Sequence, residues 1–136
     1  MNISIRCEYA CRALLELALQ DTHAPVTVET IATKRGIPEK FLVQILIQLK
    51  RSGLVNSVRG AHGGYHLSRA PQSITLLSII ESLDGPIFDP LPSANRVESE
   101  MAAIWRQVAQ EVTGVLQKVT VLDMLSSDSK STMYYI

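Results

Sequence analysis

The residues best suited to chemistry lie in the stretch 54–67, where two short apolar runs flank a polar tip. That tip holds two ionisable side chains and three glycines, namely Arg59, His62, Gly60, Gly63 and Gly64. Apolar runs around a glycine-rich connection predict a β-hairpin, and glycine lets its backbone turn sharply and lie close to a partner. Because a cation on such a tip suits a phosphate backbone or a narrow DNA groove, the hairpin is expected to contact nucleic acid.

The other reactive residue types form no catalytic set. His23, His62 and His66 fall in a predicted loop or in the hairpin, and the serines follow no nucleophile-elbow pattern. No phosphate-binding loop is present in the sequence. Cys7 and Cys11 lie four residues apart, so a helix would place them on one face, which is a poor geometry for a disulfide framework. We therefore expect a binding protein and not an enzyme.

Charge is distributed unevenly over the 136 residues, although the net charge is zero. Residues 1–70 contain nine Lys and Arg and five acids, whereas residues 71–136 contain four and eight. A basic first half indicates a polyanionic partner. The sequence has no apolar run of about 18 residues, and its N-terminus has charges where a signal peptide is apolar. We expect a cytoplasmic protein without a membrane partner.

The elements that would position the hairpin are helices in the first half of the chain. Ser4 caps a helix over 4–20, and Thr27 begins a short second helix that Gly36 ends. A third helix follows from Pro38 to about Ser52. Two short helices joined by a glycine turn predict a helix-turn-helix, to which the hairpin would add a wing. The expected inward stripe of the third helix is Phe41, Leu42, Ile45, Leu46 and Leu49.

A long heptad pattern dominates the second half. Thr75 caps a fourth helix over 76–83, a loop covers 86–97, and a last helix is expected over about 98–125. Apolar residues recur there at alternating steps of four and three, which predicts a homodimer seam; packing against the first helix of the same chain is the alternative. The seam consists of Met101, Trp105, Val108, Val112, Val115, Val119 and Leu122.

Together these features resemble the bacterial winged-helix regulators that include IscR, NsrR and CymR, over about residues 3–125. The motifs that carry the resemblance are Tyr9-Ala10, Arg35-Gly36-Ile37, Phe41-Leu42, Gln44-Ile45-Leu46, the run 49–55, Ser57-Val58-Arg59-Gly60, Gly63-Gly64-Tyr65 and Trp105. The resemblance implies a mostly α fold with a small β-hairpin wing and a long C-terminal dimerisation helix. It also implies a dimeric transcription regulator, a repressor on a palindromic operator in double-stranded DNA.

By this resemblance, recognition helix 38–52 enters the major groove and wing 55–67 enters the minor groove. The chain divides into a DNA-binding domain (1–83), a loop that holds a cluster in relatives (84–97), a dimerisation helix (98–125) and a tail (126–136). The expected DNA-binding residues are Thr27, Lys40, Phe41, Val43, Gln44, Arg51, Ser57, Arg59, Gly60, His62, Gly63, Gly64 and Tyr65.

The chain departs from the iron-sulfur members of this family. Those members carry cysteines, or cysteines with a histidine, before the dimer helix, whereas residues 86–103 contain neither. Ser99 and Ala102 stand where two ligands would lie, and such clusters need thiolates, so no cofactor is expected at the usual site. The alternative is a redox or iron-sulfur sensor with an unusual site; the opposing interpretation is that both cysteines are small buried hydrophobes. That site would use Cys7, Glu8 and Cys11.

Val43 marks a second departure, because members like IscR often have glutamate there, which can select cytosine. Valine accepts no hydrogen bond, whereas Lys40 beside it can donate to guanine or phosphate, so we expect a different operator. The inducing signal stays open between a thiol or cluster sensor, a protein effector on the acidic half and a small ligand between the dimer helix and the DNA domain. A protein-interaction module without DNA binding is the alternative from another class.

Overall fold

The computed structural model describes residues 3–20, 24–87 and 100–126. It is mostly helical with one two-stranded antiparallel sheet, as the sequence predicted. A further short helix covers residues 121–126. The other elements, in order, are α1 (Ile5–Leu19), α2 (Val28–Arg35), α3 (Glu39–Arg51), β1 (Val55–Val58), β2 (Gly64–Leu67), the 3₁₀ turn η1 (Pro71–Ser73), α4 (Leu76–Asp84) and α5 (Glu100–Lys118).

Hydroxyl side chains begin three of the helices, and the structure confirms each predicted cap. The Ser4 hydroxyl accepts from the backbone N–H of Cys7 at 3.2 Å, and Thr27 and Thr75 cap α2 and α4 in the same way. Gly36 ends α2 in the left-handed conformation, with φ 62° and ψ 40°, which glycine adopts without a steric penalty. These local signals explain why the helix boundaries were predictable from the sequence.

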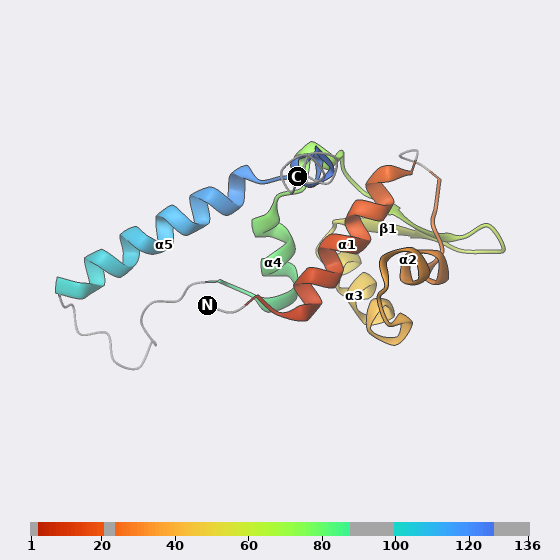
Figure 1. Ribbon diagram of the computed structural model, residues 1–136, viewed down its shortest axis with the longest axis horizontal. Helices are drawn as coiled ribbons and strands as arrows, with labels where there is room; N and C mark the ends of the chain where they lie inside the picture. The colour runs from red at the N-terminus through yellow and green to blue at the C-terminus, as the bar shows by residue number, and fades with distance from the viewer. Residues whose placement is uncertain (1–2, 21–23, 88–99, 127–136) are drawn as a thin grey trace, which may run out of the picture.

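A single apolar core holds the helix-turn-helix together, with α1 packed on α2, α3 and α4 (Figure 1). Phe41 is not part of that core, because 57% of its surface is exposed, so the prediction that it points inward is wrong. The buried stripe of α3 begins at Leu42. Because each residue turns a helix by about 100°, Phe41 points away from that stripe. The largest fully buried side chains include Leu14, Ile31, Leu42, Ile45, Leu46, Leu49, Leu54, Ile74 and Ile79.

The hairpin is confirmed, and its strand β2 is fastened to a third piece of extended chain. β1 and β2 pair antiparallel, with Val55 opposite Leu67 at the open end of the ladder. Val26 and Tyr65 also exchange two backbone hydrogen bonds, each 2.8 Å long. The wing is thereby tied to the segment that leads into α2, while its tip extends away from the helices (Figure 1).

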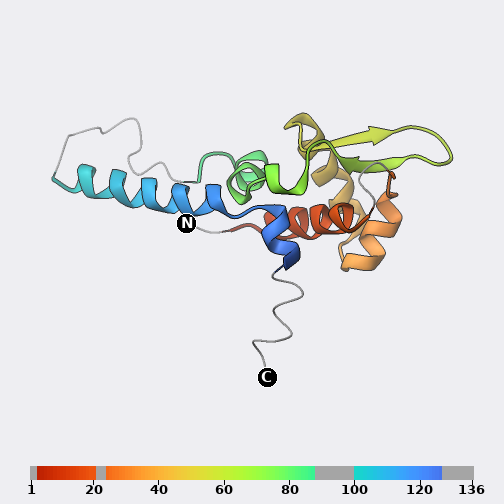
Figure 2. The ribbon, with the colours of Figure 1, turned by 90° about the horizontal axis from the view of Figure 1, so that it is seen from above.

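Helix α5 extends away from the winged domain, with its first turn farthest from the core (Figures 1 and 2). The prediction of one helix over 98–125 is wrong, because the helix ends at Lys118. Leu76 N–H donates to the Val119 carbonyl at 2.8 Å, and Val121 N–H donates to the Ile74 carbonyl at 2.9 Å. These tertiary hydrogen bonds compete with the helical ones and hold the chain extended between the two helices.

The short helix over 121–126 has its own start signal. Thr120 Oγ1 accepts from Asp123 N–H at 3.2 Å, and the Asp123 carboxylate accepts from Thr120 N–H at 2.9 Å. This reciprocal capping is visible in the sequence as a threonine followed three residues later by an acid. The break takes Val119 and Leu122 out of a continuous seam. No helix in the described ranges is long and apolar enough to cross a bilayer.

Candidate nucleic-acid interface

The outward face of α3 carries polar side chains that reach solvent. Lys40, Gln44 and Arg51 are all exposed and lie opposite the buried stripe that begins at Leu42. Within the described parts of the chain, none of these three side chains forms a hydrogen bond or an ion pair. Two cations and an amide are therefore available for a partner on one helix face.

The wing tip presents a second set of exposed groups. Arg59, Gly60 and His62 are all exposed, and Gly60 has a φ of 110°, which few side chains tolerate. Behind the tip, Lys50 Nζ donates to Ser57 Oγ at 2.7 Å and so joins the end of α3 to β1. Lys50 was missing from the predicted site, although its place in the last turn of α3 marks it as a cation next to the wing.

Close packing of the backbone explains why two glycines, Gly63 and Gly64, stand where β2 begins. A Cβ atom on Gly63 would collide with the Val58 carbonyl oxygen, and one on Gly64 would collide with the Val26 carbonyl oxygen. The close approach that these glycines permit is thus to their own chain. Tyr65 follows them and is half-buried against the core, so it anchors strand β2 to the domain.

Thr27 lies at the exposed start of α2. Its hydroxyl accepts from Thr30 N–H at 3.2 Å and donates to the Thr30 hydroxyl at 2.8 Å. The Val26–Tyr65 pairing places this helix start beside strand β2 of the wing. A helix N-terminus with exposed N–H groups is a common phosphate contact.

A buried ion pair orients α2 on α1. Arg35 Nε lies 3.1 Å from Glu16 Oε1, and only 5% of Glu16 is exposed. Removing either partner would leave an uncompensated charge in the interior, which is strongly destabilising. The sequence interpretation missed this pair because its members are 19 residues apart and belong to different helices.

The cysteines of α1 are protected thiols. Cys7 is 1% exposed, and its thiol donates to Asp84 Oδ2 at 3.0 Å, while the Ser4 hydroxyl donates to the other carboxylate oxygen at 2.9 Å. Burial and then the Asp84 contact raise the pKa of Cys7 to about 11. Burial and then the charge of Glu8 raise the pKa of Cys11 to about 12. The Cys7 thiol in turn is the main cause of the lowered pKa of Asp84.

These residues do not fit an iron-sulfur cluster, whose ligands are thiolates. Glu8 Oε1 is engaged by Arg12 Nε at 3.1 Å, and the Arg12 guanidinium also lies 5.6 Å from the centre of the Tyr9 ring. In the described ranges no three His, Cys, Asp or Glu side chains gather into a metal-binding group. The geometry favours the interpretation of Cys7 and Cys11 as packed hydrophobes.

Helix α5 exposes apolar side chains along one stripe. Trp105 is 41% exposed and Val115 is 62% exposed. Met101, before Trp105, and Val108, between the two, are exposed as well. Of the residues of α5, only Ala102 is buried. A stripe of this kind on a helix that stands off its own domain is typical of an interaction surface.

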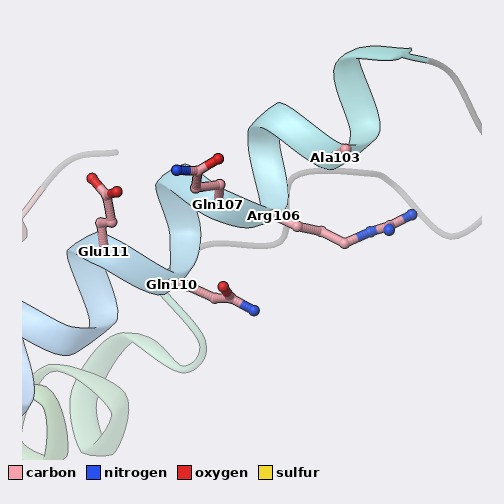
Figure 3. A pocket seen from close by; sticks show the side chains of 5 residues that line it. All are labelled: Ala103, Arg106, Gln107, Gln110 and Glu111. Carbon is pink, nitrogen blue, oxygen red and sulfur yellow. The ribbon is translucent and has the colours of Figure 1, made fainter.

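The polar flank of α5 lines an open depression of about 540 Å³ (Figure 3). All of its lining side chains come from this one helix, so it is not the predicted ligand pocket between the dimer helix and the DNA domain. Gln110 lies one turn after Arg106, and Glu111 one turn after Gln107. The lining residues are Ala103, Arg106, Gln107, Gln110 and Glu111.

The helix-turn-helix, the hairpin fastened beside it and the exposed cations define a winged helix-turn-helix protein. Residues 3–127 match the model of the family described as Rrf2, iron-dependent transcriptional regulator. The chain belongs to the Rrf2 family, and it is accordingly a transcriptional regulator of the DNA-binding helix-turn-helix type. The resemblance inferred from the sequence is thereby confirmed.

Individual relatives agree with this assignment. The HTH-type transcriptional regulator CymR of Bacillus subtilis is 33% identical over 139 residues, which cover 100% of each chain. The solved structure of CymR, the global cysteine regulator of B. subtilis, superposes with a TM-score of 0.81 over 93% of this chain and 98% of that one. The structure of T. potens IscR is 32% identical and gives a TM-score of 0.78 over 99% and 97% of the two chains.

Proposed function

We propose that the protein is a homodimeric repressor that binds a palindromic operator, with α3 in the major groove and the wing in the minor groove. The observation that carries this proposal is the pair of exposed polar surfaces on α3 and at the wing tip, which belong to one rigid core. Lys40 and Gln44 lie near the start of α3, and Arg59 lies at the tip. These groups lie on two separate elements, so α3 could occupy the major groove while the wing enters the minor groove.

Each group has a partner in DNA. The first turns of a recognition helix reach base edges, where lysine donates to guanine and glutamine pairs with adenine through two hydrogen bonds. Arg59 would enter the minor groove, whose negative potential rises as it narrows over A·T pairs. Thr27 and Arg51 would contact phosphates and fix the register of the domain on the duplex.

The dimer rests on the stripe of α5. Met101, Trp105 and Val108 are exposed in a single chain, and burying them against a second copy removes that apolar surface from water. A symmetric pair of α5 helices would present two recognition helices to half-sites one helical turn apart. Where the operator overlaps a promoter, a dimer seated across both half-sites would block RNA polymerase, and on this ground we assign repression.

The proposal is tested by capture of genomic DNA fragments with the full chain, followed by binding measurements on the enriched sequence. We expect a palindromic consensus, and an affinity that falls about a thousandfold or more between 50 and 200 mM salt, because several phosphates are neutralised. Transcription in vitro from a promoter with this sequence should decrease when the protein is added. Enrichment of no fragment would overturn the proposal and favour a protein-interaction module.

A further inference from the structure

The outward face of α3 contains an apolar strip beside its polar groups. Val43 is 38% exposed, and Ile47, one turn later, is half-buried behind it. Lys40, Val43, Gln44 and Ile47 recur at spacings of three and four, so they share one side of the helix. The buried stripe is complete without Val43, and the core of the chain therefore gives no reason for an apolar residue at this position.

A duplex offers one apolar group in the major groove, the C5-methyl of thymine. Valine can neither donate nor accept a hydrogen bond, so Val43 cannot distinguish bases by their polar edges. Against a thymine methyl it would bury apolar surface on both sides of the contact. Against cytosine or a purine it would leave polar base edges without partners, which costs free energy.

We infer that Val43 selects a thymine in each half-site by packing on its methyl group. This inference rests on the proposed function. Gln44 follows Val43 on the same face and is exposed, and its amide matches adenine. The half-site would therefore contain A·T pairs under the first turns of α3, with the thymine methyl against Val43.

Replacing single thymines of the captured operator by deoxyuridine removes only the methyl group and tests the inference directly. For replacement of this thymine in one half-site, we expect binding of the parent protein to weaken about fourfold, the value of one buried methyl-sized group. The Val43→Ala variant should bind the thymine operator more weakly and should be indifferent to deoxyuridine at that position. Binding to the unmodified operator confirms that the variant is folded.

Val58→Ala is the matched control, because Val58 is also an exposed valine, at 43%, but lies in the wing. The minor groove contains no thymine methyl, so this variant should keep the sensitivity to deoxyuridine. If no thymine shows a Val43-dependent effect while the parent still binds its operator, the inference is overturned and the proposed function stands. If the parent binds no operator, both fail.

Discussion

The α3–wing surface and the α5 stripe both expose side chains, but of opposite chemistry. The first presents Lys40, Gln44 and Arg59, whereas the second presents Trp105 and Val108. Polar groups on a surface are satisfied by water until a partner arrives. Exposure of an apolar stripe to water is unfavourable in free energy, and burial against a second apolar surface removes this penalty. The α3–wing surface is mainly polar and can stay hydrated in a single chain, whereas the α5 stripe is the surface proposed to bind a second copy.

The two surfaces also differ in how they are fastened. The wing is tied to Val26 through Tyr65 of β2 and to Lys50 through Ser57 of β1. Helix α5 packs on α4 and is joined to the domain through the extended residues 119 and 120. The α3–wing surface is therefore joined to the rest of the domain by several hydrogen bonds, whereas α5 reaches away from the domain (Figure 1).

The largest effect is expected from breaking the α5 stripe. Trp105→Glu combined with Val108→Glu should leave each chain folded, since both residues are exposed, but monomeric. The affinity for the operator should fall at least about a hundredfold, because two half-sites are no longer bound by linked domains. Sedimentation and binding titrations measure both effects. Gln107→Glu on the polar flank is the control, and a double variant that stays dimeric would contradict the proposed seam.

The Cys7 thiol should be about a hundredfold less reactive than a free thiol near pH 8. For Cys7 the pKa rises from its ordinary value of 9.0 to about 11, so the thiolate fraction falls by this factor. Iodoacetamide labelling of the native and the denatured protein measures it. Rapid labelling of the native protein, or an absorption band typical of iron-sulfur clusters, would show that these cysteines are accessible ligands after all.

The same shift makes stability depend on alkaline pH. Below pH 9 both folded and unfolded thiols are protonated, so the free energy of unfolding is unaffected. As the pH rises through 9 toward 11, the unfolded thiols ionise first, and this free energy should fall. Urea unfolding at several pH values measures the slope, and a Cys7→Ala, Cys11→Ala variant should lose it.

Arg59→Ala should weaken specific binding by about 1–3 kcal/mol without changing stability. The side chain is exposed, so its loss should remove only the proposed groove contact. Arg69→Ala is the matched control, since Arg69 is exposed just beyond the base of the hairpin. Equal affinities of the Arg59 variant and the parent would exclude the wing from the interface.

The smallest effects are expected from single glycine-to-alanine changes, which should act in opposite directions on stability in the wing and in α5. Gly64→Ala forces a clash with the Val26 carbonyl and a strained φ of 148°, and should cost about 1–3 kcal/mol of stability. Gly114→Ala in α5 meets nothing within 4 Å and should stabilise by up to about 1 kcal/mol. Thermal unfolding measures both. An unchanged stability of the Gly64 variant would mean that β2 is not held rigidly against Val26.

Much of the DNA-facing domain could be predicted because its signals are local. Ser4, Thr27 and Thr75 begin helices through contacts with residues three positions later, and Gly36 ends a helix through its own backbone. The sequence offers five apolar residues for the inward stripe of α3, but only four of them fill the core, and Phe41 is the one that does not. The residues proposed to contact DNA stay predictions until binding is measured.

The sequence by itself determined the winged helix-turn-helix, its hairpin and its family, because caps, glycine turns and apolar periods act over three or four residues. Only the tertiary structure decided that Leu76 and Ile74 hydrogen-bond to Val119 and Val121, that Arg35 pairs with Glu16 and that the Cys7 thiol is held by Asp84. Each of these depends on atoms brought together from distant positions in the chain. Such contacts form only when burial outweighs the entropy of ordering both segments, and no local pattern records that balance.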